Sequence, residues 1–466
     1  MISAQKRKIA LSVSTKGVCF IIVKTRQFEI KDMATASNLC KPSGFNDILA
    51  KFINLCNFGS MERRKNPYAP GAGIQPPALV GRDKLLLEAQ IDMERVLARR
   101  PVRSIMLLGL RGVGKTVLLN RLKADADKLG FQTAKIEAPE IGALPQLLIP
   151  ELRRILFGLD VMARAGNKLR QAMSALRNFG SAFKVQVGEI EIGMTPDPGI
   201  ADTGNIEQDM PQLIISVCEA AAERNTAIAL FIDEVQYLSP KELAALVLAC
   251  HETAQRNLPL FLVGAGLPQI AALAGNAKSY AERLFNYPEI DKLPPEAAKE
   301  ALSAPARREG VEFNDDAIEE ILRVTERYPY FIQEWGSHVW NSAPKSPITK
   351  ADVDNATPVV VDHLDANFFR VRFDRLTVLQ QKYLRAMAEL GPGPHKTGDI
   401  AAALGVEATS VATVRQQLIN KGMIWSQRHG ETAFTVPMFD KFMKRQIKIL
   451  EKHIPKPRKP SQPRLI

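Results

Sequence analysis

The sequence predicts an α/β fold in which a parallel sheet is followed by an all-helical segment and then by a small segment of helices and a hairpin. Short apolar runs alternate with amphipathic helices from Leu79 to Ile290, which is typical of a parallel sheet covered on both faces. Apolar residues then recur at three- and four-residue spacings through residues 295–372, which predicts helices. From these changes of pattern we expect domains at 61–294, 295–372 and 373–450, an extension at 1–60 and a tail at 451–466.

Four strands are expected in the first domain: Ser104–Leu108, Phe131–Ile136, Ile228–Ile232 and Leu258–Val263. Between the second and third strands, residues 183–192 alternate apolar and polar side chains around a glycine. This alternation predicts a β-hairpin that projects from the sheet. The sequence assigns no role to the hairpin.

A glycine-rich motif follows the first predicted strand and precedes a predicted helix. It fits the phosphate-loop pattern G-x-x-x-x-G-K-[ST]. Its residues are Gly109, Leu110, Arg111, Gly112, Val113, Gly114, Lys115 and Thr116, and Val117 continues into the helix. The glycines let backbone N–H groups surround phosphate oxygens, Lys115 reaches the β and γ phosphates, and Thr116 offers a hydroxyl to Mg²⁺. A glycine-rich turn without a ligand is the alternative, but the strand–loop–helix context favours a site for ATP and Mg²⁺.

A pair of acids follows the third predicted strand. The run from Ala227 to Ile232 is apolar and leads into Asp233 and Glu234, as expected where a buried parallel strand reaches the carboxyl edge of its sheet. An isolated Asp-Glu pair is usually part of a solvated loop. Together with a phosphate loop, however, the pair predicts that Asp233 anchors Mg²⁺ and that Glu234 orients or deprotonates the attacking water.

The composition narrows the class of protein. No run reaches about 18 apolar residues, which argues against a membrane span. The five cysteines are far apart, so we expect reduced thiols and a cytoplasmic protein. The six histidines are equally scattered, which predicts no metal-ligand cluster and gives His251 and His338 packing or surface roles. The net charge of +12 predicts an anionic partner.

The two ends of the chain differ in composition from the rest. Residues 1–60 hold three of the five cysteines, nine Lys or Arg against three acids, and no sustained periodicity. We therefore expect this extension to be poorly ordered or to reflect a wrongly chosen start codon. Residues 441–466 carry nine Lys or Arg, one Glu and four prolines. Such a tail does not pack, and its charge suits a nucleic-acid backbone.

The two C-terminal segments are predicted element by element. The helical lid is expected to contain Pro295–Glu309, Asp315–Arg327, Phe331–Asn341 and Thr349–Phe369. The last segment is expected to contain the helices Leu379–Leu390, Thr397–Leu404 and Ser410–Lys421 and the strands Met423–Ser426 and Thr432–Val436. Three helices and a hairpin with a basic tip at Arg428 predict a winged helix.

The third helix of this winged helix has an apolar face and a polar face. Val411, Val414 and Leu418 share the first, and Ser410, Thr413, Gln416, Gln417 and Asn420 share the second. Gln and Asn side chains bond base edges in the major groove, so the polar face and Arg428 are candidate DNA contacts. A solvated helix in a protein–protein module is the alternative that the sequence leaves open.

Because these motifs follow one another in this order, residues 66–445 resemble AAA+ ATPases of the archaeal origin-recognition branch and the related STAND signalling ATPases. The resemblance implies that Val80-Gly81-Arg82-Asp83 lies beside the adenine, which makes Arg82 a candidate nucleotide ligand. It also implies that Arg283 is an arginine finger that contacts the γ phosphate bound to a neighbouring subunit. The resemblance therefore makes a homo-oligomer one of the possible assemblies. The alternative for Arg283 is a surface ion pair, for example with Glu282.

Two positions depart from the AAA+ pattern. The last predicted strand leads into Ala265 and Gly266, where many AAA+ proteins place a polar sensor, and the nearest polar side chain is Gln269. In the lid, Pro329 resembles the proline of the STAND glycine-x-proline motif and would pack on the adenine, but Arg327 replaces the glycine. Both departures favour a slow ATPase that switches a DNA-binding winged helix. The alternative is a signalling or scaffold ATPase whose winged helix contacts proteins.

Overall fold

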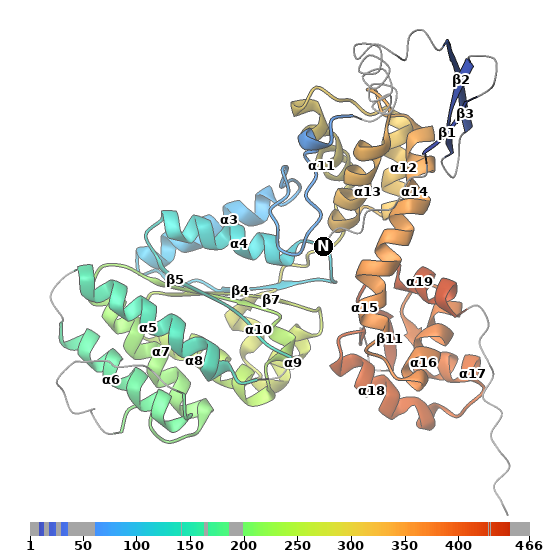
Figure 1. Cartoon of the computed structure of the whole chain (residues 1–466). Helices are drawn as coiled ribbons and strands as arrows, with labels where there is room; N and C mark the ends of the chain where they lie inside the picture. Colours follow the sequence, from blue (N-terminus) through green and yellow to red (C-terminus); the bar gives the residue numbers. More distant parts are fainter. Residues whose placement is uncertain are drawn as a thin grey trace, which may run out of the picture. The chain divides into compact units, whose positions relative to one another are not determined.

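The computed structural model of the chain describes residues 9–13, 18–24, 29–35, 61–140, 142–162, 166–185, 199–426, 428 and 430–447 (Figure 1). The chain divides into two compact units, Met1–Lys65 with Trp340–Ser346, and Asn66–Val339 with Pro347–Ile466. None of the helices in the described part of the chain is long and apolar enough to cross a membrane.

The smaller unit contains an antiparallel sheet in the order β1 (Ile9–Val13), β2 (Val18–Lys24) and β3 (Glu29–Thr35). A 3-10 turn, η1 (Arg63–Lys65), follows in the chain. In the same unit, Trp340 Nε1 donates to the Glu62 carbonyl at 3.2 Å. Most of residues 1–60 lie outside the described residues, and the prediction that this extension is poorly ordered or not native stays a prediction.

The larger unit is built on a five-stranded sheet in the order β5 (Gln132–Glu137), β6 (Ile228–Asp233), β7 (Leu260–Gly266), β4 (Ser104–Leu108) and β8 (Phe285–Asn286). Every neighbouring pair is parallel. β4 has its predicted bounds, the other three predicted strands are shifted by one to three residues at their ends, and β8 is too short to give a strand pattern. Since β7 lies between β4 and β6, the P-loop and the Asp233–Glu234 pair follow strands that are not adjacent.

Alternate residues of β6 belong to two different apolar clusters. Ile228, Leu230 and Ile232 pack with α5 (Leu144–Met162), α6 (Asn167–Ala182), α7 (Ile206–Glu223) and α8 (Pro240–Gln255). Ala229 and Phe231 pack with α3 (Asp83–Leu97) and α4 (Lys115–Lys128). The helices therefore cover both faces of the sheet, as Figure 1 shows, and explain why its central strands are apolar throughout.

The segment between β5 and β6 is largely helical. It contains α5, α6 and α7, and Phe183 is the C-cap of α6. Residues 186–198 lie outside the described residues, so the hairpin predicted over 183–192 is not tested beyond Val185. Downstream of β7, two short helices, α9 (Ile270–Ala277) and α10 (Ala281–Leu284), lead to β8.

The lid contains α11 (Pro295–Arg308), α12 (Asp315–Thr325), α13 (Pro329–Ser342) and α14 (Lys350–Leu364), close to the predicted bounds. α14 begins at a capping box in which Thr349 and Asp352 bond reciprocally, a motif that satisfies two otherwise unpaired backbone donors. It continues directly into a π-helical turn, η3 (Asp365–Phe369), and then into α15 (Arg370–Phe373).

The C-terminal module, residues 376–447, contains α16 (Val378–Glu389), β9 (His395–Lys396), α17 (Thr397–Leu404), η4 (Ala408–Val411), α18 (Ala412–Asn420), β10 (Ile424–Trp425), β11 (Glu431–Phe434) and α19 (Phe439–Gln446). β11 pairs antiparallel with both β10 and β9. Val411, Val414 and Leu418 are buried, as predicted. β9 and α19 were not predicted, and the tail 451–466 lies outside the described residues.

Candidate active site

One cavity of about 350 Å³ brings together most of the predicted nucleotide ligands. Its volume falls within the range of small-molecule sites, about 300–1,000 Å³. The predicted residues that line it are Arg82, Arg111, Gly112, Val113, Gly114, Lys115, Thr116, Val117, Glu234 and Pro329. Tyr330, Gln333, Phe368 and Arg372 of the lid and the segment Ala69–Ile74 also line it, and the sequence analysis did not identify any of them.

The P-loop is shaped by two of its glycines. A Cβ at Gly109 would lie 2.1 Å from the Ile290 carbonyl oxygen, so the loop leaves β4 along a path that only glycine permits. Gly114 has φ 93° and is the N-cap of α4, which turns the first N–H groups of that helix toward the cavity lining. The loop therefore offers backbone donors where an anion would bind.

Lys115 is buried at the start of α4. Its Nζ donates to the carbonyl oxygens of Gly109 at 2.9 Å and Leu110 at 2.8 Å. Burial lowers the pKa of Lys115 to about 8, although the nearby carboxylates of Glu234 and Asp233 act in the opposite direction. Phosphate oxygens would exchange with these carbonyl contacts and favour the charged amine.

Asp233 and Glu234 follow β6 with different surroundings. Asp233 is buried, and its Oδ1 accepts a hydrogen bond from the Glu234 backbone N at 2.9 Å. Glu234 has φ 52° and ψ 39°, a left-handed conformation that costs an L residue free energy and that clusters at functional sites. The Asp233 carboxylate and the Thr116 hydroxyl are oxygen donors of the kind that suits a hard cation such as Mg²⁺; Thr116 lines the cavity, and Asp233 is not among the lining residues.

Two side chains hold the Glu234 carboxylate. Arg111 Nη1 lies 3.8 Å from Glu234 Oε1, and the Gln236 amide donates to Glu234 Oε2. Gln236 Oε1 in turn accepts from the Leu267 backbone N at 3.1 Å, just after β7. A Cβ at Gly266 would lie 2.4 Å from Gln236 Oε1, so the glycine leaves room for that amide.

Gln236 therefore supplies the polar contact at the end of β7 that the strand itself lacks. The sequence analysis looked for this group along β7 and found Gln269 as the nearest one. The only sequence signal for Gln236 is its position two residues after Glu234. Such a contact depends on how two strands lie side by side, which the sequence spacing does not give.

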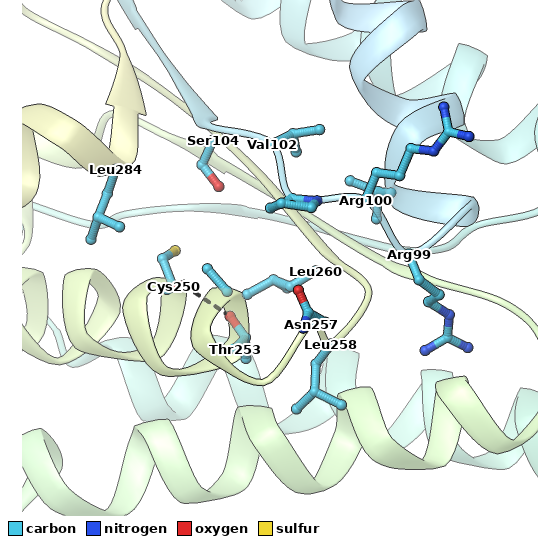
Figure 2. Close-up of a pocket in the computed structure, with 13 residues that line it drawn as sticks. Arg99, Arg100, Val102, Ser104, Cys250, Thr253, Asn257, Leu258, Leu260 and Leu284 are labelled. Carbon is cyan, nitrogen blue, oxygen red and sulfur yellow. Dashed lines mark hydrogen bonds between the residues drawn. The ribbon is translucent and has the colours of Figure 1, made fainter.

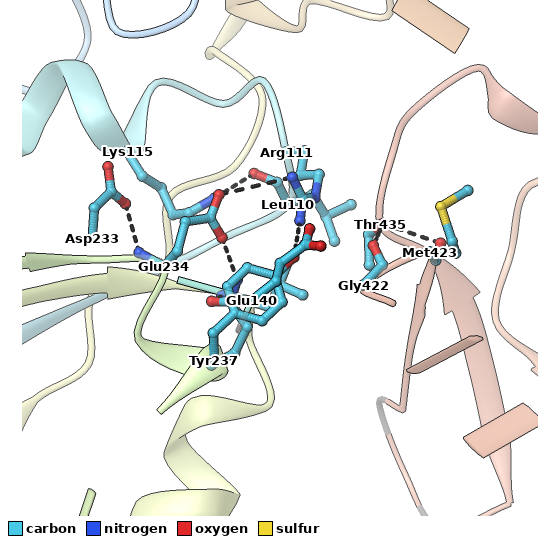
Figure 3. A network of polar contacts seen from close by, with 12 residues as sticks. Leu110, Arg111, Lys115, Glu140, Asp233, Glu234, Tyr237, Gly422, Met423 and Thr435 are labelled. Carbon is cyan, nitrogen blue, oxygen red and sulfur yellow. Dashed lines mark hydrogen bonds and ion pairs between the residues drawn. The ribbon is translucent and has the colours of Figure 1, made fainter. Parts of the chain in front are cut away.

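Arg111 also faces the C-terminal module (Figure 3). Its backbone N donates to the Thr435 carbonyl at 3.0 Å, and its Nη2 donates to the Tyr237 hydroxyl at 2.7 Å. A Cβ added at Gly422 would lie 3.1 Å from the same Nη2. One P-loop residue thus contacts both the candidate catalytic acid and the C-terminal module.

The lid places an aromatic pair and an arginine at the cavity. Tyr330 N donates to the Gly112 carbonyl at 3.3 Å, and its ring stacks on Phe368 with centroids 4.8 Å apart. The Arg372 guanidinium lies 4.3 Å from the centroid of the Phe368 ring. Burial, together with the nearby charge of Arg111, lowers the pKa of Arg372 to about 10. Arg372 is more than 250 residues from the P-loop, so no local motif predicts it.

Two further predicted ligands, Arg82 and Pro329, line the cavity, whereas Arg283 does not. The Arg82 guanidinium donates to the Asp291 carbonyl. Pro329 begins α13, and Arg327, two residues earlier, has φ 62°, so the arginine adopts the left-handed backbone that a glycine would normally provide. Arg283 is exposed on α10 and does not line the cavity, so its role as an arginine finger stays a prediction.

The candidate DNA contacts are all exposed: Ser410, Thr413, Gln416, Gln417, Asn420 and Arg428. Several of them have hydrogen bonds that fix part of the face. Gln417 Oε1 accepts from Gln380 Nε2 at 3.0 Å, and Gln416 Nε2 donates to Asn420 Oδ1 at 3.0 Å. Their role stays a prediction.

A second cavity, of about 40 Å³, lies beside Cys250 and Thr253 (Figure 2). Thr253 Oγ1 donates to the Cys250 carbonyl at 3.1 Å, and Cys250 and Cys218 are both buried and free. A space of this volume holds one or two waters at most, so it is not a nucleotide site.

Family comparisons agree with the nucleotide cavity. Residues 78–263 match a family model described as "AAA ATPase domain". The match supports an AAA+ P-loop ATPase domain with ATPase activity. A second family model, described as a domain of unknown function, matches residues 366–443. None of the curated proteins matches the chain.

Several solved structures are similar to the chain at low identity. A Walker-type ATPase of Pyrococcus abyssi is 17% identical with a TM-score of 0.47, over 77% of this chain and 95% of that one. The RuvB Holliday junction branch migration motor of Thermotoga maritima is 18% identical with a TM-score of 0.40, over 80% and 99%. The Orc1 protein of Aeropyrum pernix in complex with DNA is 17% identical with a TM-score of 0.41, over 79% and 94%.

Proposed function

We propose that the chain is a slow ATPase in which bound nucleotide changes the contact between the P-loop and the C-terminal module, and that this module is a winged helix that binds DNA. The observation that carries the proposal is the position of Arg111, between Glu234 on one side and Thr435 and Gly422 on the other. A ligand that moves Arg111 must affect both groups. Differential affinity of ATP for the rearranged form would supply the energy.

In the proposed reaction, the phosphates occupy the cavity against the P-loop N–H groups, Lys115 and Arg372. Glu234 accepts a proton from a water whose oxygen bonds to the γ phosphorus, while the bond from that phosphorus to the β–γ bridging oxygen breaks. Thr116 and Asp233 would hold Mg²⁺, which neutralises phosphate charge when bound. Because Arg111 pairs with the Glu234 carboxylate, the base is restrained until Arg111 moves, which supports a slow turnover.

The DNA-binding part of the proposal rests on the exposed face of α18 and on charge. Three helices followed by the β10–β11 pair give the order of a winged helix, in which the last helix enters the major groove. Thr413, Gln416 and Asn420 are exposed on that helix. The chain carries a net charge of +12, which favours a polyanion.

A second candidate function is a signalling or scaffold ATPase whose module contacts proteins. The contact between Arg111 N and Thr435 O favours it, because a module that is held on its own ATPase domain does not require DNA. This candidate predicts weak, salt-sensitive DNA binding that nucleotide does not change.

The switch is tested most directly at Gly422. Gly422 has φ 63° and Gly405 has φ 69°, so an alanine is strained at both, but only at Gly422 does a Cβ crowd Arg111. We expect Gly422→Ala to raise ATP turnover and to make DNA binding independent of ATP, whereas Gly405→Ala changes neither. Equal effects of the two variants would show that the contact with Arg111 has no regulatory role.

The DNA partner is tested by titrating duplex DNA at several salt concentrations, with and without ATP and Mg²⁺. The intact chain is compared with a chain that ends at Ile447 and with Gln416→Ala. A winged-helix reader retains ATP-dependent binding without the tail and loses affinity on Gln416→Ala. If removing the tail eliminates all binding, the second candidate is favoured. Lys115→Ala should lose the ATP effect in every case.

A further inference from the structure

A carboxylate and two imidazoles meet in the lid. Glu334 and His338 are four residues apart on α13, so they share one face of that helix, and His363 comes from α14. Glu334 Oε2 lies 3.7 Å from His338 Nε2 and 3.8 Å from His363 Nδ1. All three ligand atoms lie within 4.8 Å of one another. A hydrogen bond of 3.1 Å from Trp335 Nε1 to Thr357 Oγ1 joins the same two helices.

The Glu334 side chain is only 5% exposed, and its two oxygens are satisfied unequally. Oε1 accepts a hydrogen bond from the Tyr330 hydroxyl at 2.7 Å. Oε2 is buried and has no hydrogen-bond partner. A buried carboxylate oxygen without a partner is costly, so it indicates a group that completes the site.

The two histidines lie where an ion could reach them. His338 is partly buried on α13 beside Glu334, and imidazole nitrogens are common metal ligands. The His363 side chain is 45% exposed, so an ion can enter from solvent and keep a water as an additional ligand.

We propose that Glu334, His338 and His363 bind one divalent transition-metal ion of the zinc class. Two nitrogen ligands and one carboxylate oxygen, with an open fourth position, form a set that Zn²⁺ accepts. Ligand atoms around tetrahedral zinc are about 3.3 Å apart, given bonds of about 2.0–2.1 Å. The two Glu–His distances of 3.7 and 3.8 Å therefore have to shorten by about half an ångström, and the His–His distance, which is at most 4.8 Å, by up to about 1.5 Å. Imidazole ligands select against Mg²⁺, so this site is separate from the one formed by Thr116 and Asp233.

A metal ion bound at this site would link α13 to α14 near the nucleotide cavity. Tyr330 connects the two places, since its hydroxyl bonds Glu334 and its backbone N bonds the Gly112 carbonyl of the P-loop. The sequence analysis expected no metal-ligand cluster because the histidines are scattered along the chain. The fold brings two of them together by packing α14 beside α13, a contact that no sequence spacing encodes.

The experiment uses the full-length protein after treatment with a chelator and removal of the chelator. Zn²⁺ is added in a calorimeter, and Co²⁺ is added while its visible absorption is followed. We expect one ion per chain and a higher melting temperature with Zn²⁺. Zn²⁺ should not raise the melting temperature of the His363→Ala variant, and the affinity of this variant for Zn²⁺ should be at least tenfold lower. His395→Ala, which removes a histidine elsewhere, is the matched control and should behave like the wild type.

Glu334→Gln gives a second readout, because it keeps the shape of the buried side chain but removes its charge. It should also bind Zn²⁺ at least tenfold more weakly. If the wild type takes up no Zn²⁺, or if His363→Ala and Glu334→Gln bind it as tightly as His395→Ala, the proposal is wrong. Neither measurement depends on ATP turnover, so failure of the proposed ATPase switch would leave the result interpretable.

Discussion

The nucleotide cavity and the polar face of α18 differ in how far their surroundings restrict their side chains. In the cavity, Lys115 bonds two carbonyls and Glu234 is held by both Arg111 and Gln236. On α18, Thr413, Gln416 and Asn420 are exposed to solvent. The chemistry of the cavity therefore follows from its geometry, whereas the chemistry of the α18 face depends on the partner that covers it.

This difference also separates what a substitution should do in each region. A change in the cavity removes a partner from a group that is at least partly buried, so its effect should be large and specific to nucleotide. A change on α18 removes a polar group that is exposed to solvent. Its effect should therefore appear only when the partner is bound.

The largest expected effect is at the candidate catalytic acid. Glu234→Gln should lower ATP turnover by at least about 100-fold, which is the usual contribution of a general base, and should leave ATP binding intact. Phosphate release measures the turnover, and calorimetry measures the affinity for ATP, so the two effects can be separated. Glu140→Gln, which removes the carboxylate that accepts from the Tyr237 hydroxyl, is the control. A Glu234→Gln enzyme with wild-type turnover would exclude this residue as the base.

The protonation of Lys115 should make ATP affinity depend on pH. Because burial lowers the pKa of Lys115 to about 8, the amine is charged below that pH and neutral above it. Phosphate binds the charged form, so affinity should fall about tenfold from pH 7 to pH 9. Calorimetry at pH 8 in two buffers of different ionisation enthalpy should detect proton uptake, which should vanish at pH 6.5. Constant affinity across this range would mean that Lys115 stays charged.

Gln236 and Gln269 offer a sharper comparison near the carboxyl end of β7. Gln236→Ala removes a hydrogen bond to a charged group, so turnover should fall about fivefold for a loss of about 1 kcal/mol, with unchanged ATP affinity. Gln269→Ala should have no effect on turnover, although the sequence pointed to it. If Gln269→Ala impairs turnover and Gln236→Ala does not, the contact with Leu267 N is not functional.

The smallest expected effect is at Arg327, the left-handed residue two positions before Pro329. Arg327→Gly should stabilise the protein by about 0.5 kcal/mol, because glycine adopts a positive φ more easily but loses more chain entropy on folding. Arg327→Ala keeps the strain and should not stabilise. Thermal unfolding of the two variants measures the difference in stability. If Arg327→Ala also stabilises the protein, the arginine side chain and not the backbone conformation is the source of the strain.

Local patterns were enough to predict four of the five strands of the parallel sheet and the phosphate loop. β4 has the predicted bounds because its five residues are all buried and the glycine of the P-loop ends it. Val411, Val414 and Leu418 were predicted to share a buried face because helical periodicity alone places them together. In each case the deciding interactions lie within about a dozen residues.

Contacts between distant segments were not predictable from the same patterns. Arg372 reaches the cavity only because α14, η3 and α15 continue directly into one another at the end of the lid. Gln236 meets Leu267 only because β6 and β7 are neighbours. The cluster of Glu334, His338 and His363 has the same origin. A single sequence shows such residues as ordinary surface or packing positions.

The π-helical turn η3 determines how α15 is rotated relative to α14. Its extra residue widens the helix between α14 and α15, where Phe368 stacks on Tyr330 and Phe369 stacks on Phe442 with centroids 5.2 Å apart. Each residue of an α-helix advances the chain by about 100° around the axis, so deleting one residue here would turn the downstream helix by about that angle. The number of residues in η3 therefore determines the rotation of α15 relative to α14, and an insertion or deletion there should disturb the coupling between the nucleotide cavity and the C-terminal module.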